Sequence, residues 1–117
     1  MDVFSNRKME IEREVKMELF RGDSFIKKIT STYEFRTGDK IHIAVMKNAY
    51  SKKYLHEQTI TIQNNTNEIN FEILPSETDK FPIEKLLLEI ELTTIDGIVK
   101  TNQYELNVKV DGIYERK

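Results

Sequence analysis

The chain contains no cysteine among its 117 residues, and this absence removes disulfides, thiolate nucleophiles and thiolate metal sites together. It also lacks an excess of either charge, since 18 Lys and Arg stand against 20 Asp and Glu, so a broad basic surface for nucleic acid is not expected. No apolar run approaches the roughly 20 residues that cross a bilayer, and the N-terminus has no signal-peptide pattern. We therefore expect a soluble chain of a reducing compartment, with neither nucleic acid nor a membrane as partner.

What the chain has instead is a large apolar side chain at every second position in several separate runs. Such alternation is typical of β-strands buried on one face and wet on the other, as in an antiparallel sandwich or barrel. The runs are Ile41, Ile43 and Val45; Ile69, Phe71 and Ile73; Leu86, Leu88, Ile90 and Leu92; and Tyr104, Leu106, Val108 and Val110. We expect one all-β sandwich domain of roughly seven or eight strands over 1–117, with 1–6 and 112–117 as loose ends.

Turns are marked by the glycines, because all four stand beside an aspartate. Glycine reaches positive φ at little cost, and aspartate caps a turn with its side chain. Asp96-Gly97 predicts a hairpin between the last two runs. The asparagine-rich segment 64–67 predicts another, between the strand that ends near Ile62 and the run over 69–73.

Two further segments need separate interpretation. Segment 7–20 is rich in helix-forming residues, but its apolar side chains alternate, which favours a strand. These side chains are Met9, Ile11, Val15, Met17 and Leu19. Between Pro75 and Pro82, Ser76 has an acid three residues later, and this spacing predicts a single helical turn capped by the serine.

Few residues indicate catalysis or metal binding. Neither His42 nor His56 has a second histidine or an acid at metal-ligand spacing, so we expect both at the surface, with no metal and no cofactor. The carboxylates alternate with core residues on strands, and no pair stands out as a general acid and base. Arg21-Gly22-Asp23 spells a cell-adhesion motif but falls between two strands, where a turn is the simpler interpretation. We expect no enzymatic activity.

One loop combines aromatic and basic side chains. Tyr50, Lys52, Lys53 and Tyr54 follow the strand that begins at Ile41, and such a loop is suited to contact a phosphate, a sugar or a partner protein. Aromatic residues are also common anchors of interfaces. The aromatic residues that we place in loops or tails are Tyr33, Phe35, Tyr50, Tyr54, Phe81 and Tyr114. Of these, Tyr50, Tyr54 and Tyr114, with Lys52 and Lys53, are the candidate contacts.

The order of turns and strands resembles that of a known family. The matching segments are Phe20-Arg21-Gly22-Asp23-Ser24-Phe25, Thr37-Gly38-Asp39-Lys40-Ile41, Leu74-Pro75-Ser76-Glu77-Thr78 and Thr94-Ile95-Asp96-Gly97. Over residues 15–110 this succession is similar to the N-terminal domain of phage baseplate upper proteins and to short prophage proteins of the same build.

The resemblance implies an immunoglobulin-like sandwich that acts as a structural part of a phage or prophage virion. Its partners would be other tail or baseplate proteins, and several copies would be present in the particle, which is assembled in the bacterial cytoplasm. Docking would use loops at one end of the sandwich. A carbohydrate-binding module is the alternative, because loop tyrosines stack on sugar rings.

Overall fold

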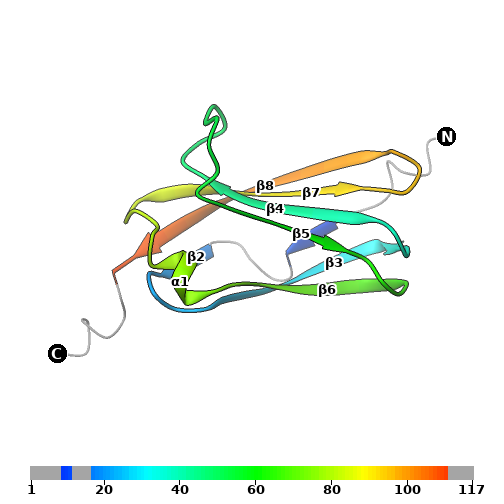
Figure 1. Ribbon diagram of the computed structural model, residues 1–117, viewed down its shortest axis with the longest axis horizontal. Coiled ribbons are helices and arrows are strands. Elements are labelled where there is room, and N and C mark those ends of the chain that lie inside the picture. The colour runs from blue at the N-terminus through cyan, green and yellow to red at the C-terminus, as the bar shows by residue number, and fades with distance from the viewer. Residues whose placement is uncertain (1–8, 12–16, 111–117) are drawn as a thin grey trace.

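Two β-sheets face each other in the computed structural model, which describes residues 9–11 and 17–110 (Figure 1). The smaller sheet has three strands in the order β1 (Met9–Ile11), β3 (Phe25–Phe35) and β6 (Thr66–Ile73). The larger sheet has five, in the order β2 (Met17–Phe20), β8 (Val99–Lys109), β7 (Lys85–Thr93), β4 (Lys40–Met46) and β5 (His56–Thr61). A short helix, α1 (Pro75–Thr78), lies between β6 and β7. The expected all-β sandwich with one helical turn is confirmed.

The strand order is that of an immunoglobulin-like sandwich. In that fold, strands B and E share one sheet while C, F and G share the other. Here β3 and β6 take the places of B and E, β4, β7 and β8 those of C, F and G, and β5 extends the larger sheet beyond β4. Every ladder is antiparallel except β2 with β8. This parallel pair differs from the expected antiparallel pattern because β2 keeps the direction of β1 after the chain has changed sheets.

The alternating runs form the core as expected. Ile41, Ile43 and Val45 on β4 are all 0% exposed. The alternating apolar residues of β7 lie beside them on the same face of the larger sheet, and those of β8 continue this face on the other side of β7. The intervening polar residues lie on the outer face. Because each strand buries one face, the two sheets enclose a single layer of apolar side chains.

The N-terminal alternation is confirmed as strand at both of its described parts. Met9 and Ile11 are buried on β1, and Met17 and Leu19 are buried on β2. The two strands nevertheless belong to different sheets. Val15 and the segments 1–6 and 112–117 lie outside the described residues.

Two predictions from the sequence, a hairpin and a helix cap, differ from the structure. The hairpin predicted at 64–67 is wrong, because β5 lies in the larger sheet while β6 lies in the smaller one, so this loop crosses between layers. The helical turn exists but begins at Pro75, and its N-cap is Leu74 without a side-chain hydrogen bond. Proline suits the first helical position because its φ is already helical and its missing N–H is not needed there. Ser76 is therefore inside the turn and does not cap it.

The hairpin predicted at Asp96-Gly97 is confirmed. Gly97 has a φ of 85°, and its N–H donates to Thr94 O at 2.9 Å. The N–H of Thr94 donates to Ile98 O at the same distance.

Among the described residues, no helix is long and apolar enough to cross a membrane.

Candidate docking surface

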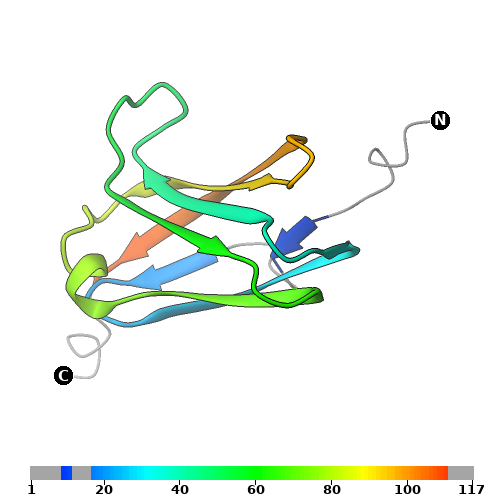
Figure 2. The same cartoon turned by 45° about the vertical axis from the view of Figure 1, so that its right-hand side comes forward.

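The loop between β4 and β5 projects from one end of the sandwich and stands clear of both sheets (Figure 2). Asn48 sets its shape, because Asn48 Oδ1 accepts a hydrogen bond from the backbone N–H of Tyr50 at 2.9 Å. The N–H of Asn48 donates to Ser51 Oγ at 3.2 Å, and the N–H of Ser51 donates to Asn48 O at 3.1 Å. An asparagine side chain that bonds the backbone two residues ahead forms a local turn. This turn places Tyr50 at the tip of the loop.

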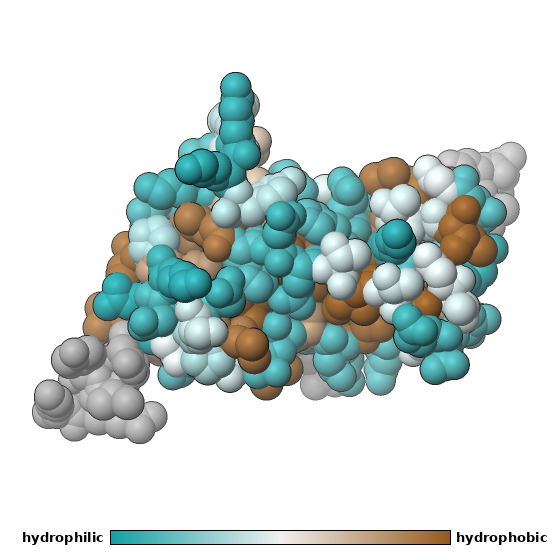
Figure 3. Space-filling model, viewed as in Figure 1, coloured by the Kyte–Doolittle hydropathy of each residue, from teal (hydrophilic) through white to brown (hydrophobic). Residues whose placement is uncertain are grey.

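Tyr50 is 93% exposed, so its ring makes almost no contact with the rest of its own chain. Lys47, Lys52 and Lys53 are exposed in the same loop. Segment 47–55 contains no acidic residue, although the whole chain has a formal charge of −2. The space-filling view shows a largely hydrophilic projection above the body of the molecule (Figure 3). The loop thus presents one aromatic ring among positive charges.

Tyr54 has a different environment from Tyr50. Its ring packs against the ring of His42, with centroids 5.6 Å apart and planes at 61°. His42 Nε2 in turn lies 2.9 Å from Glu57 Oε2. Tyr54 is 48% exposed, so it joins the base of the loop to the outer face of the larger sheet. Of the two candidate loop tyrosines, Tyr50 is therefore the one whose ring is free for a partner.

His56 occupies the same end of the sandwich but points inward. Its side chain is 9% exposed, and its Nδ1 lies 3.0 Å from Glu77 Oε1 on α1. Its Nε2 lies 2.7 Å from Gln58 Oε1. Lys80 Nζ donates to the other Glu77 oxygen at 3.1 Å. The hydrogen bond from His56, followed by that from Lys80, holds the pKa of Glu77 below its ordinary value.

The expectation of a surface histidine is therefore wrong for His56, whereas His42 lies on the outer face of the larger sheet with 27% of its side chain exposed. Both His42 and His56 contact a carboxylate, and His56 is nearly buried. His42 and Glu57 are 15 positions apart in the sequence, and His56 and Glu77 are 21 positions apart. No local spacing in the sequence therefore indicates these contacts. Within the residues that the structure describes, no group of three or more metal-ligating side chains is brought together.

Thr78 connects α1 to the turn between β2 and β3. Thr78 is 0% exposed, and its Oγ1 accepts from the N–H of Gly22 at 3.1 Å and donates to Asp23 O at 2.8 Å. The N–H of Asp23 also donates to Phe20 O at 3.0 Å. Arg21-Gly22-Asp23 thus forms the expected turn, and its backbone is held by the buried hydroxyl of Thr78.

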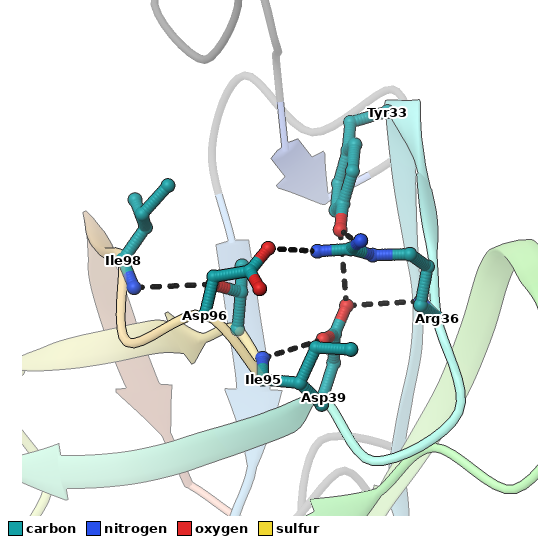
Figure 4. A network of polar contacts seen from close by, with 7 residues as sticks. Tyr33, Arg36, Asp39, Ile95, Asp96 and Ile98 are labelled. Carbon is teal, nitrogen blue, oxygen red and sulfur yellow. Dashed lines mark hydrogen bonds and ion pairs between the residues drawn. The ribbon is translucent and has the colours of Figure 1, made fainter.

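The opposite end is held by a polar network around Asp39 that sequence reasoning missed (Figure 4). Asp39 is 0% exposed. Its Oδ2 accepts from the N–H of Arg36 at 2.9 Å and from the Tyr33 hydroxyl at 3.4 Å, and its Oδ1 accepts from the N–H of Ile95 at 3.0 Å. Arg36 Nη2 donates to Asp96 Oδ2 at 2.6 Å, and the Asp96 carboxylate and Tyr33 hydroxyl raise the pKa of Arg36. The network joins the β3–β4 turn to the β7–β8 turn.

The placement of Tyr33 and Phe35 in loops is wrong. Tyr33 and Phe35 lie on β3, and Phe35 and Phe81 are 0% and 1% exposed in the core. Tyr33 is partly buried against that core. The candidate contact Tyr114 lies outside the described residues. Tyr50, Lys52, Lys53 and Tyr54 lie together on the β4–β5 loop, and these four are the candidate contacts that the structure describes.

No protein-family model and no curated protein sequence matches the chain significantly. Among solved structures, it is similar to CopC from Methylosinus trichosporium OB3b, with a TM-score of 0.56 and 12% sequence identity. The match covers 86% of this chain and 90% of that chain. A likeness at so low an identity shows a shared fold and carries no information on ligand or partner. The resemblance to baseplate proteins stays a prediction.

Proposed function

We propose that this chain is a non-catalytic docking module whose partner binds the end of the sandwich that carries the β4–β5 loop. The exposure of Tyr50 on a hydrogen-bonded turn is the observation that supports the proposal. Tyrosine is enriched among the residues that contribute most to binding at protein interfaces, because its ring buries a large area at a small cost in conformational entropy. Lys52 and Lys53 beside it favour a partner surface with acidic groups.

We infer further that the partner is a tail or baseplate protein of a phage or prophage, and that the chain is a structural part of the virion present in several copies. This step rests on the order of turns and strands described above, and the immunoglobulin-like fold is compatible with it. Assembly would take place in the bacterial cytoplasm.

The first test is mass spectrometry of purified phage particles induced from the source organism. Peptides of this chain at stoichiometric abundance would support the virion role, and their absence from intact particles would overturn it. If the chain is present, the neighbouring tail proteins are tested for binding one by one.

The docking surface is tested by Tyr50→Ala in a binding assay with the tail protein so found. An anchor of this kind contributes about 2 kcal/mol or more, so we expect the Kd to rise about 30-fold. Val99→Ala is the matched control, because Val99 is 55% exposed at the opposite end of the sandwich. Equal affinities for the wild type and both variants would exclude the loop as the contact. Thermal unfolding should be unchanged in Tyr50→Ala, since its side chain is exposed.

A carbohydrate-binding module is the second candidate, because an exposed tyrosine ring offers a flat surface for a sugar ring. This function predicts saturable binding of a glycan that Tyr50→Ala abolishes. Tyr54→Ala should have a smaller effect, since the Tyr54 ring already packs on His42. Glycan binding that neither variant alters would remove this candidate.

A further inference from the structure

The outer edge of β5 is open in the described part of the chain, because β5 is the last strand of the larger sheet. Natural sheet edges are usually protected by proline, lysine, a bulge or a covering segment. The β5 segment His56–Thr61 contains no proline or lysine, and its register with β4 is continuous. Apart from the charge of Glu57, the edge lacks such protection, and it is therefore suited to pair with another strand.

The register shows which backbone groups point outward from this edge. The N–H of Ile62 donates to Asp39 O at 2.8 Å, and these two residues are directly opposite if the β4–β5 register is extended by one position. Hydrogen-bonded and non-hydrogen-bonded positions alternate along an antiparallel strand. The N–H and C=O groups of Glu57, Thr59 and Thr61 therefore face away from β4, toward the open edge.

We propose that two copies of this chain pair along β5, antiparallel and about a two-fold axis that passes through Thr59. Thr59 then lies opposite Thr59 of the second copy, and Glu57 lies opposite Thr61. Each of these three residue pairs exchanges two backbone hydrogen bonds. This register uses all the outward-facing groups of β5 and joins the two five-stranded sheets into one. The inference does not depend on the proposed docking function.

The outer-face side chains are compatible with this register. Thr59 meets Thr59, and threonine pairs across antiparallel strands are favourable. Glu57 meets Thr61 of the second copy. The exposed Lys40 of that second copy lies on β4, directly opposite the same Thr61 on its other side. Two strand spacings, about 10 Å, separate the backbones of Lys40 and the incoming Glu57, which the two side chains together can span. Opposite charges thus approach, and like charges are not placed opposite each other.

The inner-face side chains also fit, since Gln58 lies opposite Ile60 of the second copy. Ile60 is partly buried against the core, and pairing would cover the part that stays exposed in one copy. Apolar surface shows between polar side chains on the side of the molecule where β5 and β6 lie toward the viewer (Figures 1 and 3). The corresponding pairing of β6 about Asn70 would place Glu68 opposite Glu72, which like charges oppose. Charge therefore favours the β5 edge.

An interface formed by one strand from each copy is small, so we expect a weak dimer in the high micromolar to millimolar range. Covalent trapping is the sharper test, and the absence of cysteine from the chain makes every introduced thiol unique. Thr59→Cys is treated with a short thiol-specific bifunctional cross-linker, with Thr61→Cys as the matched control on the same face of the same strand. At the axis the two Cα atoms are about 5.5 Å apart. For Thr61 the offset of four residues separates them by about 14 Å.

We expect the Thr59→Cys chain to be trapped as a covalent dimer at least about tenfold faster than Thr61→Cys, in a reaction that depends on protein concentration. Equal rates for the two variants would overturn the proposed register. Sedimentation equilibrium of the wild type that stays monomeric up to about 1 mM would overturn the dimer itself.

Thr59→Pro supplies the complementary test. The N–H that proline removes points to the open edge, so its loss leaves the β4–β5 ladder intact. We expect a folded monomer by circular dichroism and sedimentation. If proline prevents folding, Thr59→Lys has the same blocking effect on the edge without restricting φ. A folded variant of either kind that dimerises like the wild type would contradict the proposal.

Discussion

Replacing Thr78 by valine removes one hydroxyl from the junction between α1 and the β2–β3 turn while keeping the shape of the side chain. That hydroxyl is the acceptor for the N–H of Gly22 and the donor to Asp23 O. Thr78 is 0% exposed, so solvent does not reach the side chain to replace the hydroxyl. We expect the variant to fold and to be less stable than the wild type.

The size of the effect follows from these two contacts, which are shorter than the third contact of the hydroxyl, to Pro75 O at 3.3 Å. A net contribution of about 1 kcal/mol for each hydrogen bond predicts a loss of about 2 kcal/mol in the free energy of unfolding. For a domain of this size, 1 kcal/mol corresponds to a fall in Tm of about 4 °C, so we expect a fall of roughly 8 °C. This loss is smaller than the total stability of about 5–15 kcal/mol that is usual for small domains, so the variant should stay folded.

Urea denaturation and amide hydrogen exchange together test this reasoning. Thr78→Ser is the control, because it keeps the hydroxyl and loses a single buried methyl group, at a cost of about 1 kcal/mol. The amide of Gly22 should exchange faster in Thr78→Val but not in Thr78→Ser, since only the valine lacks the acceptor. Unchanged stability and unchanged Gly22 exchange in the valine variant would refute the assigned role of the hydroxyl.

Two further predictions concern a turn and an ion pair. Gly38→Ala should destabilise the protein more than Gly97→Ala in urea denaturation. Both glycines have positive φ, which costs alanine about 1–2 kcal/mol of backbone strain, but only at Gly38 would the new Cβ also lie 2.8 Å from Ile95 Cγ2. Equal losses of stability in the two variants would show that the Ile95 side chain moves away at no cost. Glu77→Gln should lower the free energy of unfolding near pH 7, and this loss should shrink as the pH falls below 4.5. The pKa of Glu77 is lowered from 4.5, chiefly by the hydrogen bond with His56, so the ionised form stabilises the fold and its contribution disappears as the pH falls through the lowered pKa.

The alternation of apolar and polar residues predicted the strands well, because a strand buried on one face requires little more than an apolar side chain at every second position. Ile41, Ile43 and Val45 illustrate this, since their spacing alone indicated the side chains that are completely buried. The same reasoning placed strands at β1 and β2 against the helix-forming composition of that segment. Turn residues were equally informative at Asp96-Gly97.

The proposed docking surface was only partly predictable. The sequence indicated an exposed aromatic and basic loop, and the structure places Tyr50 on it with its ring in water. It did not indicate that Tyr54 would pack on His42, or that His56 would reach Glu77. These pairs form between segments that lie far apart in the sequence, and no local spacing reports such contacts.

The sequence by itself determined the fold class, the positions of most strands and which of their faces are buried, because these follow from the two-residue period of an extended chain. Only the tertiary structure decided which sheet each strand joins. The segment 64–67 reads as an ordinary reversal, yet it carries the chain from one layer to the other. A turn signal specifies that the chain changes direction, whereas the choice of neighbour depends on how all the buried faces are covered at once.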